Sequence, residues 1–172
     1  IFQEDVDIHI KSNTLDYVSR GGLKLEKASN KFQLNMKDKV AMDIGSSTGG
    51  FTDCMLKNGA KRVYAVDVGY GQLDWSLRSD PRVKVMERTN IRYVKQEDIG
   101  EAIDFISIDV SFISLRLVLP VAKSLLTNNG EIIALVKPQF EAAKEDVGKN
   151  GIVRDKSIHI EVLNSIFEFA NS

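Results

Sequence analysis

The sequence predicts an α/β protein built on a doubly wound, mostly parallel sheet. Apolar runs of strand length alternate along the chain with segments of helical spacing, which is the pattern of repeated β–α units. Several of these runs end at an acid or a lysine, and the first is followed by the glycine-rich turn 45–50. Ligands of open parallel sheets bind beside the carboxyl ends of the strands, so the same pattern indicates where a site lies.

The alternation gives each element in order. Ser19 is a candidate N-cap for the first helix, in which Leu25, Ala28 and Phe32 share one face. Residues 128–130, Asn-Asn-Gly, are a turn signal before the last strand. The expected helices are 20–33, 50–58, 72–78, 115–127 and 155–170, and the expected strands are 39–44, 62–67, 83–87, 104–109 and 131–136.

The two ends of the chain set the limits of the domain. Residues 1–18 show little periodicity and are assigned to an arm or linker, whereas residues 19–172 form a single domain. The chain starts without methionine and stops one helix after the strand 131–136, which leaves that strand as a sheet edge. Natural proteins cover such edges, so we expect the intact protein to continue with at least one more strand.

Composition narrows the class of protein. A length of 172 residues with 43% hydrophobic and 27% charged residues is typical of one soluble globular domain. The single cysteine, Cys54, excludes an internal disulfide and indicates a reducing, cytoplasmic location, and its place in helix 50–58 predicts core packing. We see no membrane span, and we assign no metal site. The oligomeric state is left open.

The net charge of −1 does not by itself indicate a nucleic-acid partner. Basic residues nevertheless gather near both ends of the domain. They would form one basic face if the fold brought the two groups together. The alternative is that each is an ordinary solvated surface residue. The two groups are Arg20, Lys24, Lys27 and Lys31, and Lys137, Lys144, Lys149 and Arg154.

The turn after the first strand indicates a cofactor site. Asp43 and Gly45 are followed by the pair Gly49 and Gly50, and Ser46 stands where a dinucleotide fingerprint would have its second glycine. The free N–H groups at the start of the next helix favour a polar ligand. The spacing Asp-x-Gly-x-x-x-Gly-Gly therefore favours S-adenosylmethionine (SAM) over a dinucleotide.

A second acid supports a nucleoside cofactor. Asp67 ends the strand 62–67, 22 residues after Gly45, which is the distance at which an acid binds ribose hydroxyls. The alternative is an ordinary strand–turn–helix with a surface aspartate.

Three charged residues are candidates for chemistry. Asp109 ends the strand 104–109, Lys137 follows the strand 131–136, and Lys24 lies in the first helix. We expect the two strands to be neighbours, so that their ends meet. The apolar run before Lys137 places it for partial burial, and burial or a second cation would lower its pKa and make it a candidate base. The alternatives are a turn-capping aspartate and lysines that only reach solvent.

Five motifs follow one another along the chain: Tyr-Val-Ser-Arg-Gly-Gly-Leu-Lys-Leu (17–25), Asp-Ile-Gly-Ser-Ser-Thr-Gly-Gly-Phe-Thr-Asp (43–53), Ile-Asp-Val-Ser-Phe-Ile-Ser-Leu (108–115), Leu-Val-Lys-Pro-Gln-Phe-Glu (135–141) and Gly-Ile-Val-Arg-Asp (151–155). In this order they resemble the TlyA family, the haemolysin-like proteins with an FtsJ-type ribosomal-RNA 2′-O-methyltransferase domain. The resemblance runs from about residue 5 to the end of the chain. It implies a Rossmann-like, SAM-dependent methyltransferase fold, here without its last strands.

The resemblance implies a catalytic Lys-Asp-Lys-Glu tetrad. Lys24, Asp109 and Lys137 match its first three members, and the glutamate would lie beyond residue 172. Family members also carry an N-terminal S4-type RNA-binding domain, which this chain lacks. The implied reaction is methyl transfer from SAM to a ribose 2′-hydroxyl of ribosomal RNA, with cytidine as the expected target.

Other residues near these positions receive roles in the same reaction. Phe112 and Phe140 are candidates to stack on an extracted base, with core packing as the alternative. The loop 138–153 is expected to be mobile without RNA. Asp43, Gly45, Ser47, Gly49 and Gly50 would hold the methionine end of SAM, Asp67 its ribose, and Asn90 and Asp109 the adenine and sulfonium side.

Other functions are weighed against this one. The lysine–aspartate–lysine set argues against a SAM-dependent enzyme that acts on a small molecule or a protein side chain, since nitrogen acceptors rarely need such a base. A membrane-active cytolysin would need a span or a strongly amphipathic basic helix, and the sequence shows neither. An inactive RNA-binding remnant remains an alternative because the glutamate is not in the chain.

Overall fold

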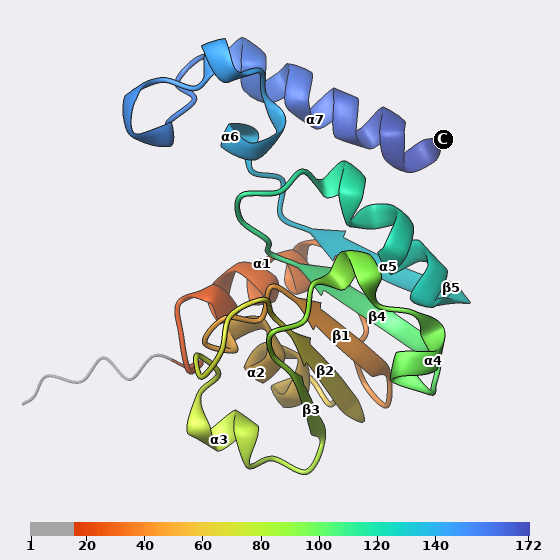
Figure 1. The fold of residues 1–172 in the computed structure, drawn as a ribbon. Helices are drawn as coiled ribbons and strands as arrows, with labels where there is room; N and C mark the ends of the chain where they lie inside the picture. Colours follow the sequence, from red (N-terminus) through yellow and green to blue (C-terminus); the bar gives the residue numbers. More distant parts are fainter. Residues whose placement is uncertain (1–15) are drawn as a thin grey trace, which may run out of the picture.

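The computed structural model describes residues 16–172, which form a five-stranded sheet flanked by helices (Figure 1). All neighbouring strands are parallel, and their order is β3-β2-β1-β4-β5. The expected α/β class and the doubly wound sheet are confirmed. The strands are β1 Val40–Ile44, β2 Arg62–Val66, β3 Val83–Met86, β4 Ile103–Ile108 and β5 Leu126–Ala134.

The helices lie on both faces of the sheet (Figure 1). All five residues of β1 are buried, as expected for the central strand of a parallel sheet that is covered on both faces. The α-helices are α1 Gly21–Phe32, α2 Gly50–Lys57, α3 Trp75–Arg78, α4 Gln96–Ile99, α5 Leu119–Leu125, α6 Pro138–Glu141 and α7 Lys156–Asn171, and the 3₁₀ turns are η1 Ile91–Tyr93, η2 Leu115–Leu117, η3 Lys144–Asp146 and η4 Lys149–Gly151.

Two apolar clusters hold the layers together. One lies between the sheet and the side of α1 and α2, where Leu25 and Met55 pack with Phe105 of β4. The other lies on the side of α5 and includes Leu125 together with Ile166 of α7. Cys54 is fully buried in the first cluster, as expected for core packing, and burial raises the pKa of its thiol to about 11.

The start and the outer face of α1 differ from the prediction. Ser19 is not the N-cap: that position belongs to Arg20, which makes no capping side-chain hydrogen bond. Phe32 is 63% exposed, and the buried face of the helix is Gly22, Leu25 and Ser29. Gly22 packs against the ring of Tyr17 and the Ser29 hydroxyl donates to the carbonyl of Leu34 at 3.3 Å, so a glycine and a serine occupy the inner face of α1.

The predicted helix 115–127 is divided, and the strand after it is longer than expected. Pro120 lies in the first turn of α5, where its missing N–H costs nothing, so η2 and α5 form separate elements. The strand β5 starts at Leu126, not at 131. The pairing of β4 with β5 changes register there, because Ile103 faces Leu126 and Phe105 faces Glu131. The turn signal at 128–130 therefore forms an irregularity inside the strand.

The segment 138–153 is not a structureless loop. It contains α6, η3 and η4, and an isolated bridge joins Gly148 to Ile152. Its mobility without RNA stays a prediction. Most of the predicted arm over 1–18 lies outside the described residues. Among the described residues β5 is an edge strand, and a further strand beside it also stays a prediction.

Candidate active site

Glycines let three loops meet at the carboxyl edge of the sheet. Gly45 has a φ of +85°, and a Cβ there would lie 2.6 Å from the carbonyl oxygen of Asp109. The turn after β1 thus packs directly on the end of β4, at the point where the strand order reverses. Open α/β sheets bind their ligands at this switch point.

A second glycine contact brings α1 to the same edge. A Cβ on Gly50, the first residue of α2, would lie 2.4 Å from Ser19 Oγ and 2.7 Å from the backbone nitrogen of Gly22. The starts of α1 and α2 therefore touch through backbone, which only glycine permits at this distance. This contact carries Lys24, on the first turn of α1, to the end of the sheet.

The three predicted catalytic side chains come together there. Lys24 Nζ donates to Asp109 Oδ2 at 2.7 Å, and Lys137 Nζ lies 2.7 Å from Asp109 Oδ1. Lys137 also donates to Ser111 Oγ at 2.9 Å. The Lys137 side chain is 20% exposed and that of Lys24 is 49% exposed, so the partial burial expected for Lys137 is found.

The charges of this cluster act mainly on Asp109. Burial raises the pKa of Asp109, but the Lys137 and Lys24 ammonium groups outweigh that effect and hold it below the ordinary value. The carboxylate therefore stays ionised around neutral pH. The contact between Asp109 and Lys137 is an ion pair without hydrogen-bond geometry. The Oδ1 atom of Asp109 is buried and accepts no hydrogen bond from the described residues.

Two hollows flank the cluster. The larger is a cleft of about 490 Å³ over the ends of β1, β2 and β4, with apolar walls from residues such as Val66, Ile91 and Ile113 and polar groups from Asp67 and Asn90. The smaller, of about 260 Å³, lies over the starts of α1 and α2 and includes Lys24 and Lys137. The residues common to both are Gly45, Ser47, Asp109 and Ser111.

Asp67 and Asn90 both lie in the wall of the cleft. Asp67 accepts the backbone N–H of Ser47 at 2.8 Å on one oxygen and that of Gly69 at 2.7 Å on the other. Each carboxylate oxygen has a second lone pair that is able to accept a ribose hydroxyl. Asn90 uses its side-chain oxygen to cap η1 through the N–H of Arg92.

Asp43 and Gly49 lie behind the turn and line neither hollow. The Asp43 carboxylate is buried and accepts the N–H and hydroxyl of Thr52 at 2.9 and 2.7 Å and the hydroxyl of Ser107 at 3.3 Å. Gly49 has a φ of +95°, and a Cβ there would run into the side chain of Leu77. Both residues shape the turn, and their predicted contact with the methionine end of SAM stays a prediction.

The burial of Asp43 gives a pH-dependent prediction. Burial raises its pKa from 3.8 to about 6, the hydrogen bonds of Thr52 and Ser107 oppose this, and the charge of Asp109 adds to it. Between these pH values the folded state holds more protons than the unfolded state, so stability falls as pH rises from about 4 to about 6. The neutral Asp43→Asn variant is expected to avoid this loss and to be more stable at pH 7.5 by about 1–3 kcal/mol.

Urea unfolding of both proteins between pH 4 and pH 8 measures this difference. We expect the difference between the two curves to be smallest near pH 4, where Asp43 is protonated in the folded state and about half protonated in the unfolded state, and to grow as pH rises to about 6. An equally steep pH dependence in Asp43→Asn would show that Asp43 is not its source.

Phe112 and Phe140 form a pair at the mouth of the site. Their ring centroids are 5.1 Å apart with an interplanar angle of 49°, and Lys137 Nζ lies 5.9 Å from the centre of the Phe140 ring. Phe112 is 90% exposed and has a φ of +62°, so it is held outward in a strained backbone conformation. The core-packing alternative is wrong for Phe112.

Sequence reasoning missed two polar residues of the site. Ser111 contacts Lys137, and Glu141 joins the loops that follow β4 and β5. Serines and glutamates at loop positions carry no periodic signal, so only the folded contacts identify them.

Comparisons with known proteins show the family to which the chain belongs. Residues 17–172 match the FtsJ-like methyltransferase family. The chain is 59% identical over 96% of its length to YqxC of Bacillus subtilis, whose name carries a provisional rRNA-methyltransferase assignment, and covers 59% of that protein. It is 49% identical over 83% of its length to the 16S/23S rRNA (cytidine-2′-O)-methyltransferase TlyA of Mycobacterium tuberculosis and covers 53% of it.

A solved structure is similar over nearly the whole chain. A protein from Streptococcus thermophilus that carries the hemolysin name superposes with a TM-score of 0.89 at 58% identity, over 93% of this chain and 58% of that one. The chain thus spans somewhat more than half the length of these relatives. It belongs to the FtsJ-like methyltransferase family, as its motifs predict.

Proposed function

We propose that the protein is a SAM-dependent methyltransferase that modifies a ribose 2′-hydroxyl of ribosomal RNA, with a cytidine as the target. The observation that carries the proposal is the Lys24–Asp109–Lys137 cluster at the junction of the two hollows. The name of the M. tuberculosis relative describes the same reaction.

The larger cleft fits the adenosine part of SAM. Its apolar walls suit the adenine ring, and the Asp67 carboxylate faces the cleft for the ribose hydroxyls. Gly45 and Ser47 line both hollows, and the methionine end would reach along them toward the start of α2. When bound, SAM supplies an electrophilic methyl group to the attacking oxygen in an in-line displacement.

The cluster supplies what a ribose hydroxyl needs, because this hydroxyl is a poor nucleophile near neutral pH. Lys137, which contacts both Asp109 and Ser111, is placed to receive the hydroxyl proton in its neutral amine form, or to steer that proton in its ammonium form, as the new O–C bond forms and the methyl–sulfur bond breaks. Asp109 orients both ammonium groups. Lys24 stabilises negative charge on the oxygen, and the positioning of these groups contributes much of the rate.

The mouth of the site suits an unpaired nucleotide. Phe112 presents an exposed ring beside Phe140, and stacking on aromatic rings is the common way to hold an extracted base. Ribosomal RNA or a ribosomal subunit is therefore the proposed partner. The described residues contain no helix long and apolar enough to cross a membrane.

The cofactor half of the proposal is tested by calorimetric titration with S-adenosylhomocysteine. We expect one-to-one binding, and we expect Asp67→Ala to weaken it by about 10- to 100-fold, since a hydrogen bond to a charged group is worth about 1.5–3 kcal/mol. Asp80→Ala is the matched control, because Asp80 pairs with Arg82 just before β3, at the amino ends of the strands and away from the cleft. Equal binding by wild type and Asp67→Ala would refute the assigned ribose contact.

A further inference from the structure

The loops that follow β4 and β5 are joined by one carboxylate. Glu141, at the end of α6, accepts the hydroxyl of Ser114 at 2.6 Å on Oε2 and the backbone N–H of Leu115 at 2.7 Å on Oε1. Both oxygens are used, and both donors lie at the start of η2. The contact spans 26 residues of sequence and ties the loop 135–142 to the loop 109–115.

The same two loops carry the other side-chain contacts of the proposed site. Asp109 and Ser111 belong to the first loop and Lys137 to the second, and Phe112 stacks with Phe140 across the gap. The Lys137 contacts are made by a flexible side chain, and the ring pair is exposed at Phe112. The Glu141 bonds are charge-assisted and one of them is to backbone, so they are the firmest link between the loops.

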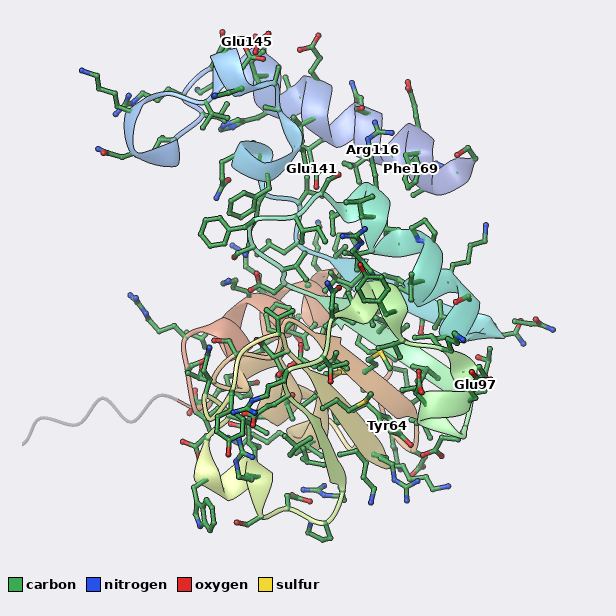
Figure 2. The ribbon with its side chains drawn as sticks, viewed as in Figure 1. Tyr64, Glu97, Arg116, Glu141, Glu145 and Phe169 are labelled. Atoms are coloured by element: carbon green, nitrogen blue, oxygen red, sulfur yellow. The ribbon has the colours of Figure 1, made fainter. Side chains whose placement is uncertain are left out.

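The turn that Glu141 holds is itself anchored on its far side. Arg116 of η2 donates to Ser165 Oγ of α7 at 2.5 Å, and its guanidinium lies 5.0 Å from the centre of the Phe169 ring. Figure 2 shows Glu141 and Arg116 at the junction between α7 and the elements below it. The loop after β4 is therefore attached at two places, to Glu141 and, through Arg116, to α7. Of these two attachments, Glu141 is nearer in sequence to the residues of the proposed catalytic cluster.

We propose that Glu141 is a positioning residue, which acts through Ser114 and Leu115 to hold Asp109 and Lys137 in register for methyl transfer and to keep Phe112 beside Phe140. The inference rests on the proposed function, because it concerns the same site. Glu141 lines neither of the two hollows of that site, so its effect is on catalysis and RNA engagement and not on cofactor binding.

Three variants test this role. Glu141→Ala removes both bonds. Glu141→Gln retains an acceptor for the Leu115 N–H and offers an amide donor to Ser114 Oγ, so it is the conservative rescue variant. Glu145→Ala is the matched control, because Glu145 is an exposed acid on η3 of the same segment and makes no hydrogen bond or ion pair among the described residues (Figure 2).

The kinetic measurement is methyl transfer to ribosomal subunits by the intact protein, with kcat and the KM for SAM determined separately. We expect Glu141→Ala to lower kcat by up to about 100-fold, which is the cost of a displacement of about 1 Å between catalytic groups, with the KM for SAM within about threefold of wild type. Glu141→Gln should recover most of the rate, and Glu145→Ala should match wild type. A wild-type kcat in Glu141→Ala would overturn the inference, and so would a general loss that Glu141→Gln fails to recover.

A second measurement does not depend on activity. Amide hydrogen exchange, in the presence of S-adenosylhomocysteine, should be faster in Glu141→Ala at Leu115 and in the loops 109–115 and 135–142, but unchanged in Glu145→Ala. Unchanged exchange in Glu141→Ala would overturn the inference even if activity fell. If wild type exchanged as expected but transferred no methyl group to RNA, the proposed function would fail while the role of Glu141 in holding the loops would stand.

Discussion

Replacing Lys137 by methionine is expected to lower kcat for methyl transfer by about 10²- to 10⁴-fold, the usual contribution of a positioned acid–base group. Methionine keeps much of the length of the side chain but removes the ammonium group that contacts Asp109 and Ser111. The ribose hydroxyl would then lose the group that receives or steers its proton. Cofactor affinity should change little, because Lys137 lies in the smaller hollow and not in the proposed adenosine cleft.

Single-turnover transfer of labelled methyl groups to ribosomal subunits measures this effect at the chemical step. Lys123→Met is the control, since Lys123 is an exposed lysine on α5, away from both hollows. A rate for Lys137→Met within about fivefold of wild type would show that Lys137 takes no part in the proton transfer.

Replacing Gly45 by alanine is expected to destabilise the fold by about 3 kcal/mol or more and to abolish measurable cofactor binding. Left-handed backbone costs a residue with a side chain about 1–2 kcal/mol. The new Cβ would also lie 2.6 Å from the backbone oxygen of Asp109, and backbone moves aside less easily than a side chain. The turn after β1 and the end of β4 would have to separate, which opens the junction between the two hollows.

Gly100→Ala separates these two causes. Gly100 has a φ of +76°, and a Cβ there would have no heavy atom within 4 Å, so its substitution measures the backbone strain alone. We expect Gly100→Ala to lose about 1–2 kcal/mol and to bind S-adenosylhomocysteine normally. Equal losses of stability in the two variants, with equal cofactor binding, would contradict a special role for the contact between Gly45 and Asp109.

The sheet and the meeting of Asp109 with Lys137 could be predicted from the sequence because both depend on strands. The buried parallel strands are nearly continuous apolar runs, and the residue after such a run lies at the carboxyl edge, where neighbouring strands meet. Asp109 and Lys137 follow two paired strands, β4 and β5. The same reasoning found Asp67 at the end of β2.

The sequence identified the glycines of the turn after β1 but explained only part of their role. The sequence suggested that they make room for a ligand. The structure shows Gly45 and Gly50 making room for other backbone, namely the end of β4 and the start of α1. A glycine motif of this kind indicates that other atoms lie close to the backbone, but it does not show whether those atoms belong to a ligand or to the protein.

Asp43, Ser19 and Glu141 show what one-dimensional patterns miss. Asp43 ends an apolar run like Asp67 does, yet its carboxylate is turned inward to Thr52 and Ser107. Ser19 is a good capping residue by type, but the contact with Gly50 sets its position. Glu141 acts across 26 residues of sequence, through contacts that exist only after β4 and β5 pair.

The most direct test of the proposed function is the chemical identity of the product. The intact protein should be incubated with SAM carrying a labelled methyl group and with ribosomal subunits, and the RNA should then be digested to nucleosides. The account predicts label in a 2′-O-methylated nucleoside, chiefly cytidine, and its loss in the Lys137→Met variant. Label on a base or on ribosomal protein, or no label although S-adenosylhomocysteine binds, would contradict it.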